Sequence, residues 1–263
     1  MVKIRAFRAI EDFEACQRFI EGHTRVLRSI GVTEVSSAKN EWAYNPAAFV
    51  ILVESIDGEK VLGGARVHAA GGAHPLPFED AVGEFDNKIY GLVEARQLKG
   101  TGELCGLWNS AEVSGMGIGS VFLIRSAVAI TTMIGLQSLF ALCSPYTTRM
   151  AGNYGFESQR EIGNNGTFYY PKMNLLATVM CLPDTEKLTD ANEFEKERIC
   201  SLRNEPVQSS VEVSKRADMA TGKKDELFIT YDLRLPSANP REFKVAPQSS
   251  LNRLSSLKVK YAS

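Results

Sequence analysis

A glycine-rich turn between a strand and an apolar helix constrains the fold of this chain more than any other feature. Residues 104–108 are predicted to form a strand, and residues 120–134 follow as a helix that is apolar on nearly every side. Such a helix is buried, and Gly135 suits the left-handed position that ends many helices. The turn between them is Ser114-Gly115-Met116-Gly117-Ile118-Gly119-Ser120. Alternate glycines let a backbone approach an anion closely, and the first N–H groups of a helix attract it, so the turn predicts phosphate binding.

Two common nucleotide motifs do not fit this turn. A dinucleotide fingerprint, G-x-G-x-x-G, would need glycine at Ser120 or at Phe122, depending on the register. A triphosphate loop needs a Gly-Lys pair, and the sequence has no lysine between Lys99 and Lys172. Two interpretations stay open: the turn binds another kind of phosphate, or it only packs the helix tightly against its strand.

The order of elements up to residue 182 predicts an α+β fold, with a mixed sheet and helices on its faces. A strand at residues 4–8 precedes a helix capped by Asp12, and the Asp57-Gly58 dipeptide joins two strands as a hairpin. An insertion from Pro75 to residue 93 has a helical pattern that glycines could divide in two. After the buried helix come a strand at 138–142, a helix capped by Ser144, and a long strand at 167–182.

Composition changes after Pro183, and we expect two parts in the chain. Residues 1–182 form the main domain, and residues 183–263 form a C-terminal extension that packs on this domain or on a partner subunit. Within the extension, residues 185–202 predict an amphipathic helix, 204–226 a polar linker, and 228–233 an isolated strand. The extension makes a homodimer plausible.

Composition excludes several classes of protein. Lysine and arginine number 30 against 31 aspartates and glutamates, so the chain lacks the basic field of a nucleic-acid binder. The N-terminus has no signal-peptide pattern and no apolar run is long enough to span a membrane, which predicts a cytoplasmic protein. The histidines have no metal or triad spacing, and the scattered cysteines suggest neither disulfides nor a metal site. These residues are His23, His68, His74, Cys16, Cys105, Cys143, Cys181 and Cys200.

The segment from Glu103 to Phe156 resembles the core of the GCN5-related N-acetyltransferase (GNAT) superfamily. Gly117-Ile118-Gly119 matches the end of the Q/R-x-x-G-x-G/A turn of that family, a buried helix follows at once, and Gly155-Phe156 lies at the usual distance. The resemblance implies that the turn binds the pyrophosphate of acetyl-CoA or another acyl-CoA, with no metal. One departure is Ser114, which stands where the family has a long polar side chain.

A narrower set of features is similar to the acyl-homoserine-lactone and N-acyl amino acid synthases. These features are the 64–67 strand, the insertion near Pro75, and Glu103-Leu104-Cys105-Gly106. Such relatives often take acyl chains from acyl carrier protein, and their central strand begins Glu-x-Ser-Arg. This chain keeps the glutamate and has Gly106 in the place of the arginine.

The resemblance implies roles for individual residues. Glu103 is expected to be the general base, and backbone N–H groups near Trp108 and Asn109 to polarise the thioester carbonyl at a strand bulge. Many relatives protonate the leaving thiolate with a tyrosine at the place of Ala151, so Tyr154 is the expected substitute, with Tyr146 also near. Arg66 is a candidate to bind an acceptor carboxylate or a phosphate.

Three functions remain open from the sequence. The first is an acyl-CoA-dependent N-acyltransferase that acts on a small-molecule or protein amine. The second is a non-catalytic protein that keeps the fold to bind acyl-CoA or to assemble with a partner, which the changes at Ser114, Ala151 and Gly106 favour. The third is a synthase that uses acyl carrier protein.

Overall fold

The computed structural model describes residues 1–32, 40–72, 74–217 and 221–235. Its strands are β1 (Val2–Arg8), β2 (Ala48–Ser55), β3 (Val61–Ala69), β4 (Thr101–Asn109), β5 (Ser138–Cys143), β6 (Glu157–Ser158), β7 (Thr167–Tyr169), β8 (Leu176–Leu182), β9 (Val207–Ala217) and β10 (Lys224–Asp232). Its α-helices are α1 (Phe13–Ser29), α2 (Pro77–Val82), α3 (Lys88–Gln97), α4 (Leu123–Ile130), α5 (Pro145–Gly152) and α6 (Glu193–Asn204). Short helices are η1 (Ala9–Glu11), η3 (Asn40–Tyr44), η4 (Ala111–Val113) and the π-helix η5 (Ile118–Phe122).

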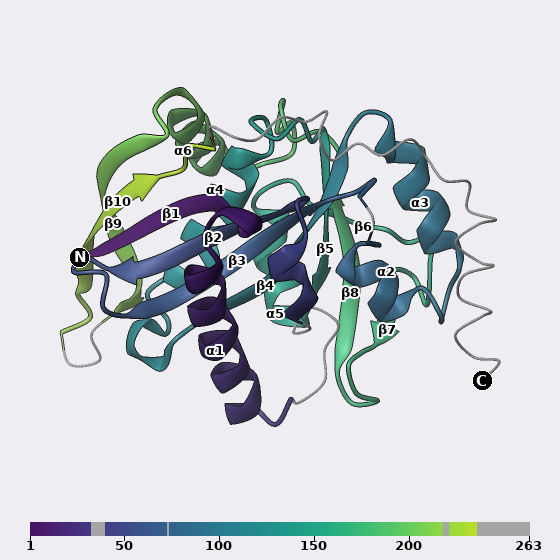
Figure 1. The fold of residues 1–263 in the computed structure, drawn as a ribbon, viewed down its shortest axis with the longest axis horizontal. Helices are drawn as coiled ribbons and strands as arrows, with labels where there is room; N and C mark the ends of the chain where they lie inside the picture. The colour runs from purple at the N-terminus through teal and green to yellow at the C-terminus, as the bar shows by residue number, and fades with distance from the viewer. Residues whose placement is uncertain (33–39, 73, 218–220, 236–263) are drawn as a thin grey trace.

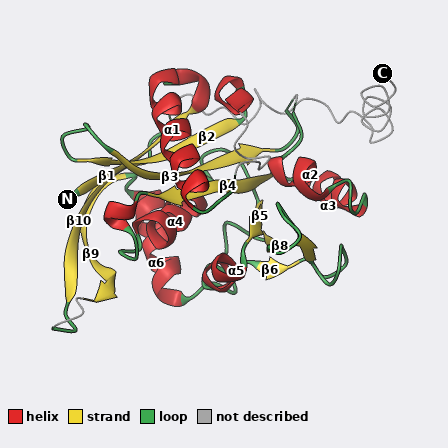
Figure 2. Cartoon of the chain, turned by 90° about the horizontal axis from the view of Figure 1, so that it is seen from below, coloured by secondary structure: helices red, strands yellow, loops and turns green. Residues whose placement is uncertain are grey.

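The strands form one mixed ten-stranded sheet, in the order β6-β8-β5-β4-β3-β2-β1-β10-β9, with β7 paired to β8. Neighbouring strands are antiparallel except for β4 with β5 and β1 with β10. Helix α1 covers one face of the sheet, and α4, α5 and α6 lie on the other (Figures 1 and 2). The α+β fold with a mixed sheet predicted from the sequence is therefore confirmed.

Local sequence signals set several boundaries as predicted. The Asp12 carboxylate accepts a hydrogen bond from the Ala15 N–H at 2.9 Å and begins α1, and the Ser144 hydroxyl accepts one from Thr147 to begin α5. Gly135 is left-handed, with φ of 66°. The insertion forms two helices, α2 and α3. Every residue of α4 is buried, as its apolar pattern requires.

Three predicted elements differ from the structure. The long strand expected at 167–182 is a hairpin of β7 and β8, since Pro171 cannot donate to a sheet and the Tyr170 N–H bonds to Leu175 at 2.8 Å. The helix expected from residue 185 begins only at Glu193, where the Asn192 side chain caps it. The stretch expected to be a linker contains β9. A strand at a sheet surface normally buries its apolar residues and exposes its polar ones. Strand β9 does the opposite, with polar residues buried and valines exposed, so its sequence does not indicate a strand.

Buried ion pairs join the C-terminal part of the described chain to α4. The fully buried guanidinium of Arg125 donates to both carboxylate oxygens of Glu195 in α6, with Nε at 2.9 Å, and to Glu212 in β9 at 2.8 Å. Arg198 also pairs with Glu212. Strand β10 pairs in parallel with β1. The division into domains at residue 182 stays a prediction, and residues 236–263 of the predicted extension lie outside the described residues.

Among the helices that the structure describes, none has both the length and the apolar character needed to cross a membrane.

Replacing Arg125 by alanine should lower the free energy of unfolding by about 3 kcal/mol or more, because buried Glu195 would lose the cation that it pairs with and buried Glu212 would lose one of its two. Urea denaturation measures this change. Arg234→Ala is the matched control, since the pair that Arg234 forms with Asp232 is largely exposed and should be worth under about 1 kcal/mol. Equal effects from the two substitutions would show that the Arg125 network does not hold the C-terminal strands.

Candidate active site

The centre of the sheet opens where β4 and β5 separate. The two parallel strands pair only from Thr101 with Ser138 to Leu104 with Ala141. Beyond that point β4 continues along β3 as far as Asn109, while β5 continues along β8. A cavity of about 570 Å³ lies at this separation and is lined by consecutive residues of both strands.

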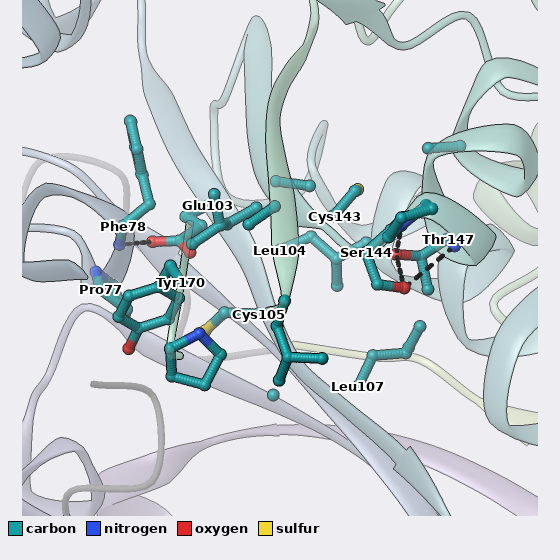
Figure 3. Close-up of a pocket in the computed structure, with 18 of the residues that line it drawn as sticks. Pro77, Phe78, Glu103, Leu104, Cys105, Leu107, Cys143, Ser144, Thr147 and Tyr170 are labelled. Atoms are coloured by element: carbon teal, nitrogen blue, oxygen red, sulfur yellow. Dashed lines mark hydrogen bonds between the residues drawn. The ribbon is translucent and has the colours of Figure 1, made fainter. Parts of the chain in front are cut away.

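The cavity passes through the sheet from one face to the other. His23 and Leu27 of α1 line it on one face, and Ile124 of α4 lines it on the opposite face. In Figure 3, Glu103, Pro77 and Tyr170 lie toward one end of the lining, while Ser144 and Thr147 lie toward the other. A site of this form can hold a ligand that extends from one face of the sheet to the other.

A bulge shapes the wall of the cavity in β4. The β3–β4 pairing jumps from Cys105 to Trp108, so two residues of β4 oppose one of β3. Gly106 lies in the bulge with φ of 59°, a conformation that favours glycine. Gly106 and Leu107 both line the cavity. The bulge therefore falls earlier in the strand than expected, because the predicted position near Trp108 and Asn109 is regularly paired with β3.

Glu103 is the buried carboxyl of the cavity. One carboxylate oxygen accepts a hydrogen bond from the Phe78 N–H at 2.8 Å, at the start of α2 (Figure 3). Burial raises the pKa of the Glu103 carboxyl to about 8, and the hydrogen bond from Phe78 and the charge of Arg66 only partly oppose this effect. The carboxyl therefore exchanges its proton near neutral pH, as a general base must.

Arg66 lies in β3, directly behind the bulge. Its guanidinium is fully buried over the ring of Trp42, with Cζ 4.3 Å from the ring centroid. A Cβ placed on Gly106 would lie 3.0 Å from Nε and Nη2 of Arg66, which is a tight contact, and the positive φ of Gly106 also disfavours other residues at this position. Burial, with a smaller contribution from the Arg66 charge, lowers the pKa of His23 to about 4. The imidazole that lines the cavity is therefore neutral at physiological pH.

Tyr154, the expected proton donor, lies in the core. Its hydroxyl donates a hydrogen bond to the Val121 carbonyl at 2.8 Å, and burial raises its pKa well above the ordinary value. Tyr154 is not among the residues that line the cavity, whereas Ala151 is. Position 151, where the resemblance to the GNAT superfamily implies a tyrosine, thus lines the cavity, but here it has only a methyl group.

Trp108 and Asn109 do not line the cavity either. The indole of Trp108 packs edge-on against Phe19 of α1, with centroids 5.7 Å apart. The Asn109 amide donates to the Ser110 carbonyl at 2.8 Å, and a side chain at Gly119 would collide with it. The structure thus places Asn109 as a support for the glycine turn.

The glycine turn begins the buried helix, as the sequence predicts. Gly117 has φ of 93°, and its carbonyl accepts the first hydrogen bonds of η5, which continues into α4. Two cations of β9 reach the turn. The backbone N–H of Lys215 donates to the Met116 carbonyl at 3.2 Å, and Cγ of its side chain lies 2.9 Å from where a Cβ of Gly117 would be; the Arg216 guanidinium donates to the Ser114 carbonyl at 3.2 Å. The distant C-terminal strand thus brings basic side chains to a turn that lacks a long polar residue of its own.

The thiols of the cavity are not thiolates at neutral pH. Burial raises the pKa values of Cys105 and Cys143 to about 12. Within the described ranges, no group of three or more histidine, cysteine or acidic residues is placed to hold a metal ion.

Sequence reasoning missed several parts of the site. Lys215 and Arg216 lie in the stretch that was expected to be a linker, and nothing local indicates that they approach residue 114. The Phe78 N–H, which contacts Glu103, comes from an insertion whose position on the sheet has no sequence signal. Only the bulge had a signal in the sequence, because a glycine inside a strand, here Gly106, often marks a bulge.

No protein-family model and no curated protein matches the chain. Among solved structures, it is similar to FeeM, an N-acyl amino acid synthase from uncultured soil microbes. The TM-score is 0.55 at 16% identity, over 74% of this chain and 98% of FeeM. It is less similar to the CoA-dependent acyl-homoserine lactone synthase BjaI, with a TM-score of 0.47 at 13% identity over 76% and 90% of the two chains. An aminoglycoside acetyltransferase solved with coenzyme A has a TM-score of 0.45 at 19% identity, over 75% of this chain and 99% of the acetyltransferase.

The similarity to FeeM, together with the separated central strands and the glycine turn, defines the fold. The chain has the fold of the GNAT acyltransferases, as the turn and its flanking elements predict.

Glu103 should give the protein a distinctive dependence of stability on pH. The pKa of Glu103 in the folded protein, about 8, lies above the ordinary value of 4.5. The contribution of the protonated carboxyl to the free energy of unfolding is therefore fully present below pH 4.5 and is lost as the pH rises to 8. Glu103→Gln keeps an acceptor for the Phe78 N–H and does not titrate. Urea midpoints should therefore fall from pH 5 to pH 8 more steeply for the wild type than for the variant. Parallel curves would contradict the raised pKa.

Proposed function

We propose that this protein is an acyl-CoA-dependent N-acyltransferase that transfers an acyl group from a thioester to the amine of a small molecule. The observation that carries the proposal is Glu103, a buried carboxyl with a pKa of about 8, in a cavity that crosses a sheet of the GNAT fold. FeeM, which shares this fold, is an N-acyl amino acid synthase, and this supports a small amine as the acceptor.

In the proposed complex the donor lies between β4 and β5, on the face covered by α4 and α5. Its pyrophosphate binds the turn from Ser114 to Ser120, where helix N–H groups favour an anion. Lys215 and Arg216, which contact the same turn, add positive charge for the phosphates. The thioester then lies at the bulge of Gly106.

The proposed reaction is a direct transfer. The amine nitrogen attacks the thioester carbonyl, a C–N bond forms, and Glu103 takes the proton that the nitrogen loses, directly or through a water. The C–S bond then breaks, and the thiolate of CoA takes a proton. The Tyr154 hydroxyl donates its hydrogen bond to the Val121 carbonyl, and Ala151 has no acidic proton. We therefore assign to solvent the proton that the thiolate takes.

Two features of the cavity support direct transfer over an acyl-enzyme intermediate. The thiols of Cys105 and Cys143 have pKa values of about 12, so the nucleophilic thiolate is scarce. The bulge places the backbone of Gly106 and Leu107 in the wall, outside the regular β3–β4 register, and in the proposed complex a backbone N–H there binds the carbonyl oxygen. Arg66 lies directly behind Gly106, so in place of direct substrate binding we assign it an electrostatic role, in which its charge favours the negative oxygen of the intermediate.

Glu103→Gln should lower turnover about 100-fold or more, because the amide cannot accept the amine proton, and should leave CoA affinity unchanged. The wild-type rate should rise with pH and level off above the pKa of about 8, and the variant should lose this step. Release of free CoA thiol from acyl-CoA with a panel of amines measures the rate. Unchanged rates in the variant would remove Glu103 as the base, and CoA binding without turnover of any amine would indicate a binding protein.

The double variant Lys215→Ala/Arg216→Ala should bind CoA about tenfold more weakly, because two cations near the phosphates are lost. The loss should shrink at high salt, which screens exposed charges. Isothermal titration calorimetry with CoA measures it. The control Lys223→Ala/Lys224→Ala removes two exposed cations from the same hairpin and should bind CoA normally. If the two double variants bind alike, the phosphates do not lie at the turn.

A further inference from the structure

The half of the cavity on the α1 face has no function in the transfer step itself. We propose that it holds a long apolar acyl chain, so that the donor is a medium- or long-chain acyl thioester rather than acetyl-CoA. This inference rests on the proposed function and specifies its donor.

Apolar side chains from two separate segments build this half. Leu27 and Ile30 come from the end of α1 and the residue after it, and Val32 follows them. Opposite them, the β7–β8 turn contributes Pro171 and Leu175. Neither segment contacts the glycine turn in the interactions described above, so this wall serves a part of the ligand other than the phosphates.

The wall has almost no charge to offer a polar ligand. No lysine, arginine or aspartate of the described chain lines the cavity. His23 is neutral because its pKa is lowered to about 4, and Cys105 and Cys143 stay protonated. A charged group placed there would lose its hydration without gaining a partner, which is costly, whereas a hydrocarbon chain loses nothing.

The rim of the same half also presents large apolar side chains, beside the polar Asn174 and Lys172, whose ammonium donates to the Gly31 carbonyl. Ile30 and Leu176 line the cavity and are nevertheless 67% and 40% exposed, and Met173, in the same turn, is 82% exposed. Large apolar side chains gathered around an apolar cavity mark a binding groove. A chain that extends past Glu103 would cover them.

The size of the cavity agrees with a long chain. Its volume of about 570 Å³ falls within the range of about 300–1,000 Å³ that drug-sized ligands occupy. An acetyl group has a single methyl beyond the carbonyl and would leave the α1 half without contacts. Each methylene buried there should raise affinity about fourfold, which corresponds to about 0.8 kcal/mol.

A chain-length series tests the proposal on the full protein. Acetyl-, butyryl-, octanoyl- and dodecanoyl-CoA are titrated by calorimetry, and thiol release is measured with one amine held fixed. Affinity and kcat/KM should rise by about 100-fold or more from acetyl to the best longer chain. Equal values, or the highest values for acetyl, would overturn the inference and leave the proposed function intact. If no thioester binds at any length, both fail.

A variant locates the chain within the cavity. Leu27→Trp fills the α1 half and should shift the preferred donor toward shorter chains, with dodecanoyl-CoA losing at least tenfold more affinity than acetyl-CoA. Leu176→Trp at the rim provides the same test if the first variant does not fold. The control Leu98→Trp changes an exposed leucine outside the cavity and should keep the wild-type preference.

An unchanged chain-length profile in Leu27→Trp and Leu176→Trp would place the acyl group elsewhere and overturn the proposal. The same follows if affinity depends on an apolar group in the acceptor and not on the acyl length, because this half would then belong to the acceptor.

Discussion

The separation of β4 from β5 is the constraint on which the rest of this structure depends. Parallel strands that stayed paired would leave a closed sheet, with no passage between its faces. Here the pairing ends after Leu104, and a bulge follows at Gly106, against which the buried Arg66 packs so closely that a Cβ there would lie 3.0 Å from its guanidinium. Unpaired strand edges normally cost stability, so a gap kept open in the middle of a sheet indicates a site for a ligand.

The same constraint explains the chemistry of Glu103. The carboxyl lies beside the gap but is covered by the start of α2, so it is buried without being isolated from the cavity. Burial disfavours its charge, while one N–H and a nearby arginine keep the anion accessible near neutral pH. A carboxyl with these properties can take a proton near neutral pH and return it to solvent.

Much of the fold could be predicted from local signals, because Asp12, Ser144, Asp57-Gly58 and the glycine turn specify structure through their immediate neighbours. Strand β9 could not be predicted from such local signals. Its buried residues are the polar Glu212 and Ser214, and the burial of Glu212 is compensated by Arg125, nearly ninety positions earlier. The site divides in the same way. Glu103 and the turn were predicted, whereas the Phe78 N–H, the cations of β9 and the apolar wall from α1 depend on contacts between distant segments.

The most direct test is a crystal structure with an unreactive thioether analogue of octanoyl-CoA. We expect the sulfur to lie at Gly106, within reach of Glu103, with the pyrophosphate on the turn at Gly117 and the alkyl chain passing through the sheet toward Leu27. A ligand bound outside the gap between β4 and β5, with that gap unchanged, would contradict this expectation.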